Sequence, residues 1–192
     1  DRLFAMRDQV FADQRALDEW IGKQGFSPEL AEKISQGVPP PKRAADDVVV
    51  ALDLRNGTLA WKTTLSGFPT GRTSSSTPCL ANERIFAIGG KRIFCLDTKT
   101  GKLIWETGIH QKGVASSPLY YDGKIFALIG SLRAYDAKSG VLLWDNKQVS
   151  GNTASPVLWK TGNSTLIVCN SNKTVVGVNP QSGVTQWQGP GG

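Results

Sequence analysis

Polar side chains that could bind an anion gather in three segments between apolar runs of this sequence. The set combines cationic, imidazole, hydroxyl and amide groups: Arg72, Thr73, Ser74, His110, Lys112, Asn152 and Thr153. Such groups hydrogen-bond to carboxylates, and the cationic ones do so most strongly. Ordinary polar loops have the same composition, so the set forms a binding site only if the fold brings the three segments to one surface.

Common catalytic and metal-binding motifs do not occur in the chain. There is no G-x-S-x-G, P-loop, H-E-x-x-H or EF-hand sequence. One histidine and three cysteines, without a C-x-x-C pair, argue against a zinc site. Cys79, Cys95 and Cys169 each lie in an apolar run and are expected to be buried free thiols. We therefore assign no catalytic or metal-binding residue from the sequence.

The net charge of the chain limits the classes of partner that it is expected to bind. Its 192 residues carry a net charge of +6, from 22 basic and 16 acidic side chains. The excess is dispersed and forms no basic run, which favours a solvated surface over nucleic-acid binding. No run of 18 apolar residues occurs, so no transmembrane segment is expected, and the opening Asp-Arg-Leu-Phe shows no signal peptide.

Four copies of one eleven-residue pattern set the period of the chain. They read ALDLRNGTLAW (51–61), CLDTKTGKLIW (95–105), AYDAKSGVLLW (134–144) and GVNPQSGVTQW (177–187). Each has an Asp or Asn, a Gly four residues later and a Trp four residues further on: Asp53, Gly57, Trp61, Asp97, Gly101, Trp105, Asp136, Gly140, Trp144, Asn179, Gly183 and Trp187. Successive tryptophans are 44, 39 and 43 residues apart. A period near 40 residues indicates a propeller or a solenoid.

The pattern has the chemistry of a tight turn between two strands. An Asp or Asn side chain accepts hydrogen bonds from backbone N–H groups two residues on, and the glycine supplies the positive φ that the turn needs. The tryptophan then lies at a fixed place on the outgoing strand, where its ring can dock on a neighbouring repeat, so we expect all four rings to be largely buried. The predicted role of the acidic residues is therefore to close turns.

The rest of each repeat supplies short strands separated by turn residues. Three repeats contain four strands each: 76–80, 84–89, 92–97 and 102–107; 116–121, 124–129, 132–136 and 141–145; 154–159, 165–169, 174–179 and 184–188. Residues 1–6, DRLFAM, match the second strand of these repeats. Four short antiparallel strands form one blade of a β-propeller. In this order Cys79 and Cys95 lie two strands apart, too far for a disulfide.

Residues 7–47 interrupt the strand pattern. Apolar residues recur at helical spacing between Arg7 and Gly22, and Ser27 followed by Pro28 predicts the start of a second helix that ends near Gly37. Three prolines at 39–41 then indicate an extended linker. We interpret residues 7–47 as a helical insertion within the first blade, and residues 1–6 and 48–192 as propeller blades.

The predicted fold is therefore all-β: a β-propeller of four-stranded antiparallel blades with tryptophan-docking repeats, incomplete at about 3.75 blades, plus a small helical insertion. Within a blade, the loops between the second and third strands share one face with the crossings to the next blade. This face would hold the crossings 66–74, 108–115 and 146–153, and with them all seven polar candidates. The open ends are expected to bind the remaining blades of a full-length chain.

The repeats resemble the pyrroloquinoline-quinone-like (PQQ-like) propeller family. The resemblance rests on the D-x-x-x-G-x-x-x-W cores and on the Ser–Pro strand openings at Ser76–Pro78, Ser117–Pro118 and Ser155–Pro156. It covers residues 1–6 and 48–188. WD40 repeats have a similar period, but only Trp144–Asp145 reads WD and no repeat contains Gly-His.

This resemblance implies two different functions. The family divides between quinoprotein dehydrogenases, which bind the quinone and a metal on the propeller axis, and non-catalytic relatives such as an outer-membrane assembly lipoprotein. Our first hypothesis is a periplasmic or secreted binding and scaffold module that presents its loop face to a protein or polymer partner. The alternative is a fragment of a PQQ-dependent alcohol or sugar dehydrogenase, whose loop candidates would contact PQQ beside calcium. Both groups of the family share the repeat, so the repeat alone does not choose between them. A structural segment without a binding site of its own is the third hypothesis.

Overall fold

The computed structural model describes residues 14–37, 47–65, 76–89, 92–108, 116–151, 154–162 and 164–191. The chain divides into two compact units, one containing the helices and the other containing the strands. Neither helix of the described ranges is long and apolar enough to cross a membrane.

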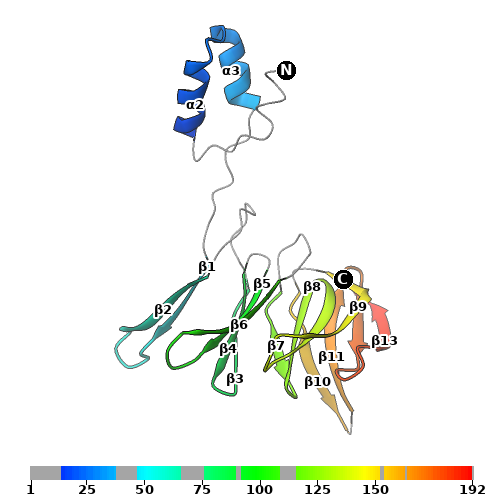
Figure 1. Ribbon diagram of the computed structural model, residues 1–192. Helices are drawn as coiled ribbons and strands as arrows, with labels where there is room; N and C mark the ends of the chain where they lie inside the picture. Colours follow the sequence, from blue (N-terminus) through cyan, green and yellow to red (C-terminus); the bar gives the residue numbers. More distant parts are fainter. Residues whose placement is uncertain are drawn as a thin grey trace. The chain divides into compact units, whose positions relative to one another are not determined.

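The helical unit is a pair of short amphipathic helices, α2 (Gln14–Lys23) and α3 (Pro28–Gly37) (Figure 1). Leu17, Ile21 and Ile34 are buried between them. The Ser27 hydroxyl accepts a hydrogen bond from the Leu30 N–H at 3.3 Å, so Ser27 caps α3. The predicted helical segment is therefore confirmed within residues 14–37.

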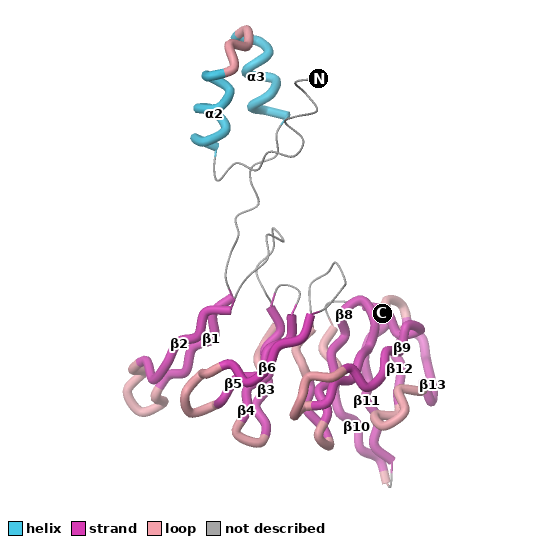
Figure 2. The backbone as a smooth tube through the Cα atoms, in the orientation of Figure 1, coloured by secondary structure: helices cyan, strands magenta, loops and turns pink. Residues whose placement is uncertain are grey.

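The strand unit consists of four antiparallel sheets, which we number as blades (Figures 1 and 2). Blade 1 contains β1 (Asp47–Leu52) and β2 (Leu59–Leu65). The other strands are, in blade 2, β3 (Cys79–Ala81), β4 (Arg84–Gly89), β5 (Arg92–Asp97) and β6 (Leu103–Gly108); in blade 3, β7 (Leu119–Tyr121), β8 (Lys124–Asp136) and β9 (Leu142–Gly151); in blade 4, β10 (Val157–Thr161), β11 (Ser164–Ser171), β12 (Thr174–Val178) and β13 (Thr185–Pro190). This arrangement confirms the predicted all-β blades. Residues 1–6, the predicted second strand of blade 1, lie outside the described part of the chain.

Blade 3 differs from the prediction, because β8 replaces two expected strands, 124–129 and 132–136, with one continuous strand. The chain nevertheless folds back at Gly130, where φ is 71°. The Ala137 N–H donates to the Gly123 carbonyl at 2.9 Å, which holds the two ends of β8 together. Gly130 and Ser131 also pair with β9, so strand pairing continues through the reversal.

The third expected crossing, 146–153, is also largely strand, since β9 extends to Gly151. The pairing register shifts between Ser131, opposite Ser150, and Leu132, opposite Asn146. The intervening residues form a bulge that turns Val149 into the core between blades 3 and 4 and leaves Lys147 and Gln148 exposed. Bulges of this kind redirect side chains and often lie beside functional sites.

Apolar clusters fill the spaces between successive blades. Successive side chains of a strand point to opposite faces, so Ile93 and Cys95 of β5 face blade 3 whereas Phe94 and Leu96 face blade 1. The buried members are, between blades 1 and 2, Leu65, Ile85, Ala87, Phe94 and Leu96; between blades 2 and 3, Phe86, Ile88, Ile93, Cys95, Ile125, Ala127, Ile129, Tyr135 and Ala137; between blades 3 and 4, Phe126, Leu128, Leu132, Ala134, Val149, Ile167, Cys169, Val176 and Val178. Burial on both faces explains why the central strands read as nearly continuous apolar runs.

The strand register places the predicted loop face at one edge of the blades. Arg92 at the start of β5 pairs with both Gly89 at the end of β4 and Gly108 at the end of β6. Gly130, at the reversal of β8, pairs with Gly151 at the end of β9. The strand ends that lead into the crossings therefore lie beside the turns between second and third strands, and the D-x-x-x-G turns lie at the opposite edge.

The cysteines follow this strand order. Phe86 of β4 pairs with Cys79 on one side and with Cys95 on the other, so a whole strand separates the two cysteines. All three cysteines are free thiols. Cys95 and Cys169 are buried, and burial raises the pKa of Cys169 to about 11.

We expect the thiols to react with an alkylating reagent in an order set by burial. At about pH 8, Cys79 should be labelled first, because Cys95 and Cys169 are buried and thiolate is the reactive form. Peptide mapping by mass spectrometry after timed labelling gives the order, with a sample labelled in denaturant as the control. Rapid labelling of Cys95 in the native protein, or a 79–95 disulfide, would contradict the strand order.

Candidate functional site

The repeated turns have nearly the same hydrogen-bond geometry. In blade 2 the Asp97 carboxylate accepts from the N–H groups of Lys99 at 3.1 Å and Thr100 at 2.8 Å, and from the Thr100 hydroxyl at 2.7 Å. The Gly101 N–H donates to the Asp97 carbonyl at 2.9 Å, with φ of 68° at Gly101. Asp136 and Asn179 make the corresponding side-chain bonds in their own turns. In blade 1 the Asp53 carboxylate accepts from the Arg55 N–H at 2.9 Å and also forms an ion pair with the Arg55 side chain at 2.7 Å.

These bonds hold the turn carboxylates in their charged form. Hydrogen bonds from the Thr100 and Ser139 hydroxyls are the main cause of the lowered pKa of Asp97 and Asp136. The Arg55 side chain lowers the pKa of Asp53. A carboxylate with a lowered pKa and occupied lone pairs is a poor general base at neutral pH, so the geometry favours turn closure over catalysis for these three residues.

Three of the motif tryptophans bridge successive blades. Trp61, Trp105 and Trp144 donate their indole N–H groups to carbonyls of the next turn, those of Thr98, Ala137 and Pro180, at 3.0, 3.2 and 3.2 Å. Each ring also lies against the next turn glycine. A Cβ at Gly101 would lie 2.5 Å from the Trp61 ring, and one at Gly140 would lie 2.6 Å from the Trp105 ring. The glycine is thus required both for its positive φ and for the space that the ring occupies.

Trp187 is the exception among the four. Its ring packs against Gly177 of its own blade and meets Trp159 edge-on, with ring centroids 5.8 Å apart. It is 36% exposed, and the other three motif tryptophans are less exposed than this. The expectation that all four rings would be largely buried is therefore wrong for Trp187, because no described turn of a following blade covers it.

Polar contacts that the sequence analysis missed reinforce the bridges. Two residues after the tryptophan, the Thr63 hydroxyl donates to the Gly101 carbonyl at 2.6 Å, and the Asn146 amide donates to the Gly183 carbonyl at 2.8 Å. This shared position, two residues after Trp, is a sequence signal that could have identified them. At the other end of the repeat, the Thr77 N–H donates to the Ser117 hydroxyl at 2.9 Å and the Ser117 N–H donates to the Ser155 hydroxyl at 3.0 Å. The Ser–Pro openings thus link the first strands of neighbouring blades.

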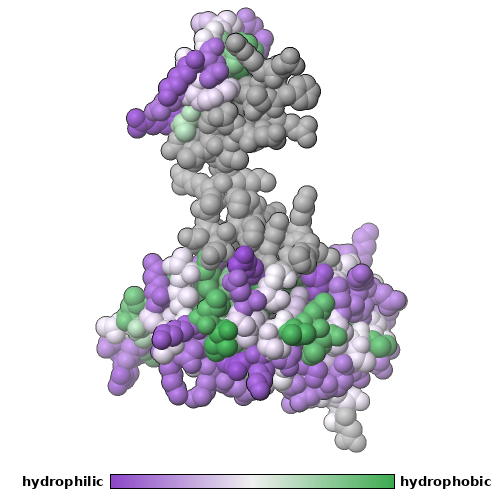
Figure 3. Space-filling view, in the orientation of Figure 1, coloured by the Kyte–Doolittle hydropathy of each residue, from purple (hydrophilic) through white to green (hydrophobic). Residues whose placement is uncertain are grey.

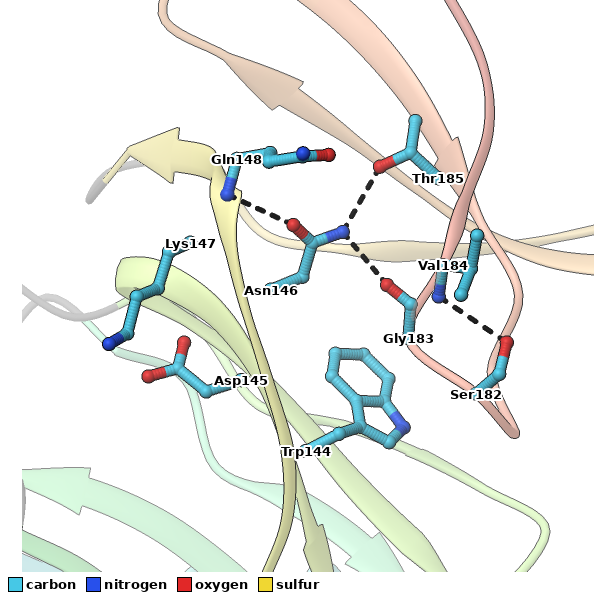
Figure 4. A pocket seen from close by; sticks show the side chains of 9 residues that line it. All are labelled: Trp144, Asp145, Asn146, Lys147, Gln148, Ser182, Gly183, Val184 and Thr185. Carbon is cyan, nitrogen blue, oxygen red and sulfur yellow. Dashed lines mark hydrogen bonds between the residues drawn. The ribbon is translucent and has the colours of Figure 1, made fainter.

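A pocket of about 420 Å³ lies between the β9 bulge and the turn that precedes β13 (Figure 4). Its lining consists of Trp144, Asp145, Asn146, Lys147, Gln148, Ser182, Gly183, Val184 and Thr185. Asn146 lies at its centre, donating to the Thr185 hydroxyl at 3.0 Å and accepting from the Gln148 N–H at 3.0 Å. Exposed amide and ammonium groups on the bulge are suited to hydrogen bonding with a polar chain, such as an extended peptide.

Asp145 at the pocket wall is engaged in a partly buried ion pair. Its carboxylate lies 3.2 Å from Arg133 Nε and accepts a hydrogen bond from the Ser131 hydroxyl. Arg133 and Asp145 are also directly opposite each other in the strand register. Burial raises the pKa of neighbouring Tyr135, and Arg133 partly opposes this shift. The arrangement is that of a cross-strand pair that stabilises the blade.

The seven loop candidates Arg72, Thr73, Ser74, His110, Lys112, Asn152 and Thr153 lie outside the described residues. Their assignment to the loop face stays a prediction from the strand order. Across the described ranges, no three His, Cys, Asp or Glu side chains come together as a metal site would need.

Each motif tryptophan should stabilise the fold in proportion to the contacts that its ring makes with the turn of the next blade. We expect Trp105→Ala to lower the free energy of unfolding by about 3 kcal/mol. This is the lower end of the range for truncating a buried aromatic side chain to alanine, because the Trp105 ring is only partly buried. Trp187→Ala, which removes no contact to a following turn, should cost less than half as much. Urea unfolding at low protein concentration measures both, and equal losses would show that the bridge does not stabilise the blades.

The turn carboxylates predict a pH dependence. Because the folded pKa of Asp136 is lowered, its contribution to stability is complete above the unfolded pKa of about 3.9 and is lost as the pH falls through the folded pKa. Asp136→Asn keeps the acceptor oxygen, as Asn179 does naturally, but cannot titrate. Its stability at about pH 6 should resemble the wild type and should fall less by about pH 2.5.

The matched control for this experiment is Asn179→Asp, which adds a titrating carboxylate to the fourth turn and should steepen the acid loss. Urea midpoints at the two pH values test both variants. An unchanged pH dependence in Asp136→Asn would show that the turn does not hold the carboxylate in its charged form.

Comparison with known proteins agrees with this geometry. The sequence model of the family described as outer membrane protein assembly factor BamB matches residues 45–191. No curated protein matches the chain. Among solved structures, BamB from Moraxella catarrhalis superimposes with a TM-score of 0.56 at 19% identity, over 74% of this chain and 46% of that one.

Two dehydrogenases share the fold with similar TM-scores. A europium-containing methanol dehydrogenase gives a TM-score of 0.54 at 16% identity, over 73% of this chain and 38% of that one. The quinohemoprotein alcohol dehydrogenase from Comamonas testosteroni gives 0.50 at 19% identity, over 62% and 21%. The chain spans less than half the length of each of these proteins. Since the family match covers every described strand, the chain belongs to the PQQ-like repeat family described as outer membrane protein assembly factor BamB.

Proposed function

We propose that this chain is a non-catalytic binding module that presents the loop face of its blades to a protein partner. The observation that carries the proposal is the match of residues 45–191 to the family described as an outer membrane protein assembly factor. A factor that assembles other proteins must contact them, and this family supplies both the fold and that role. The same membership supports a periplasmic or outer-membrane-associated location.

The chemistry of the described residues supports a binding role. Turn closure engages the carboxylates of Asp53, Asp97 and Asp136, and a cross-strand pair engages Asp145. Burial raises the pKa of the thiols of Cys95 and Cys169 and so disfavours the nucleophilic thiolate. By contrast, the bulge near the crossing end of β9 exposes Lys147 and Gln148 beside a pocket that also borders the D-x-x-x-G turn of blade 4. A rigid scaffold with polar groups on loops and bulges is a common architecture for recognition.

The alternative is a fragment of a PQQ-dependent dehydrogenase. The methanol dehydrogenase shares the fold, and a fold at this level of identity does not distinguish the two functions. Within the described ranges, the acidic side chains do not converge in a set suited to calcium. The residues that would contact PQQ, such as Arg72 and Lys112, are in the undescribed crossings, so we derive no catalytic step through the quinone.

Site-specific photocrosslinking in the native cell tests the binding role. A photoreactive residue at Gln148, on the bulge near the loop face, should form one predominant adduct with a specific protein. The matched control is Lys138, which is exposed in the same blade at the opposite edge and should form none. Mass spectrometry identifies the adduct, and an excess of protein without the photoreactive group should compete it away.

The same full-length protein is then mixed with PQQ and calcium, and dye-coupled oxidation of alcohols and sugars is measured. We expect no turnover. Quinone-dependent turnover would favour the dehydrogenase, and equal adducts from positions 148 and 138 would contradict a partner at the loop face.

A further inference from the structure

The pocket between blades 3 and 4 is built on a bulge that the other described blades lack. Elsewhere in the described strands, the pairing register shifts only beside the D-x-x-x-G turn. In blade 3 it shifts a second time, between Ser131 and Leu132. Apolar side chains occur in several separate places on the face shown in Figure 3, so exposed apolar area alone does not single out a site. The bulge does, because bulges are retained features that redirect side chains.

Asn146 holds the bulge and the opposite wall of the pocket together. Its amide nitrogen donates to the Gly183 carbonyl at 2.8 Å and to the Thr185 hydroxyl at 3.0 Å, and its oxygen accepts from the Gln148 N–H at 3.0 Å. At the same position of blade 1, Thr63 makes only the bond to the turn carbonyl of the next blade. A threonine is therefore enough to join two blades, and the additional contacts of Asn146 shape the pocket.

These contacts leave two hydrogen-bond donors beside the pocket. The Thr185 hydroxyl accepts from Asn146, so its own proton is free to bind a ligand, and no described residue accepts that proton. The Gln148 side chain extends from β9 toward Thr185 and makes no hydrogen bond with any residue that the structure describes (Figure 4). Val184, in the same lining, is 56% exposed. Two donors suit a carbonyl oxygen, and Val184 suits an apolar group next to it.

The donors that face the pocket are uncharged, which favours a carbonyl over a carboxylate. Asp145 and Lys147 contribute to the lining, but Figure 4 shows their side chains extending from the opposite side of β9. Asp145 is also engaged by Arg133 and Ser131. A carboxylate in the pocket would have no cation to pair with, and burying an unpaired charge is costly. A peptide carbonyl needs only the hydrogen bonds.

A sugar is the other neutral ligand that is rich in oxygen, and the aromatic residue of the lining argues against it. Sugar rings commonly stack on an open aromatic face. The Trp144 ring packs against Gly183, where a Cβ would lie 2.6 Å from it, and meets Phe126 with ring centroids 5.7 Å apart. Because these contacts engage the ring, the pocket favours a peptide.

We propose that the pocket between β9 and β13 binds an extended peptide segment of the partner protein. Gln148 and Thr185 hold one backbone carbonyl of the segment, and the adjacent apolar side chain lies on Val184. β9 and β13 are the outermost strands of their blades in the described chain, so an extended segment fits along their edges. In this way the pocket recognises the partner of the proposed function, on which this inference rests.

A random library of short linear peptides, displayed on phage and selected on the full-length protein, supplies the probe. The selected peptide is synthesised with blocked ends, and its affinity is measured by fluorescence anisotropy. Thr185→Val keeps the shape of the side chain but removes the donor, and it should weaken binding roughly two- to tenfold, as expected for one hydrogen bond. Asn146→Thr introduces the residue of blade 1 and should keep the bridge to Gly183 while weakening binding to a similar extent. The matched control is Thr64→Val, at an exposed threonine of β2, which should bind like the wild type.

Far-UV circular dichroism and thermal unfolding check that each variant is folded. Failure to enrich any peptide, or an affinity that neither Thr185→Val nor Asn146→Thr changes, would overturn the peptide pocket. Binding of maltoheptaose that depends on Thr185, in place of the peptide, would show a sugar site instead. The proposed function is judged separately, by the adduct from position 148 in the cell. An adduct that persists in Thr185→Val, together with unchanged peptide affinity, would leave the binding role standing and remove the pocket.

Discussion

The contact of a tryptophan ring with the turn glycine of the next repeat joins local and long-range structure in this fold. The glycine adopts a positive φ that closes its own turn, and its missing Cβ leaves the space that the ring of the preceding blade fills. A side chain at Gly140 would therefore both strain the turn and displace the Trp105 ring. The indole N–H satisfies a carbonyl of the same turn, so the ring is fixed in orientation as well as in position. One short pattern thus determines the shape of each turn and the spacing of the blades.

Because of this contact between tryptophan and glycine, the two edges of the blades have different roles. At the turn edge, the carboxylates, the glycines and the tryptophans all contribute to the same contact, and a change in any of them disturbs the packing of a neighbouring blade. At the crossing edge, the strands β6 and β9 end without such a shared motif. Segments there can vary in length and composition at little cost to the core. A binding surface is therefore more easily built at the crossing edge, where the bulge of β9 already exposes polar groups.

Sequence reasoning was most successful where structure depends on neighbours in the chain. The turns, the strand alternation and the Ser27 cap of α3 each follow from a few adjacent residues. The continuous β8 was not predictable, because it depends on Gly130 and Ser131 pairing with the end of β9. The bulge at 147–149 and the Arg133–Asp145 pair likewise depend on the register between two strands. Of the candidate site, only its edge could be predicted, since strand order assigns the crossings but no periodicity sets the side-chain positions within them.

The same nearest-neighbour logic makes the end blades different from the others. In a repeat protein, stability is approximately a sum of the stability of each repeat and of the interfaces between neighbours. Blades 2 and 3 gain an interface on each face, whereas blades 1 and 4 gain one within the described chain. The side chains that a second interface would bury, Val50 and Leu52 at one end and Trp159 at the other, are consequently exposed. Among the described blades, blades 2 and 3 are therefore the ones that the contacts of Trp61, Trp105 and Trp144 hold on both faces, and a change in these contacts should disturb them most.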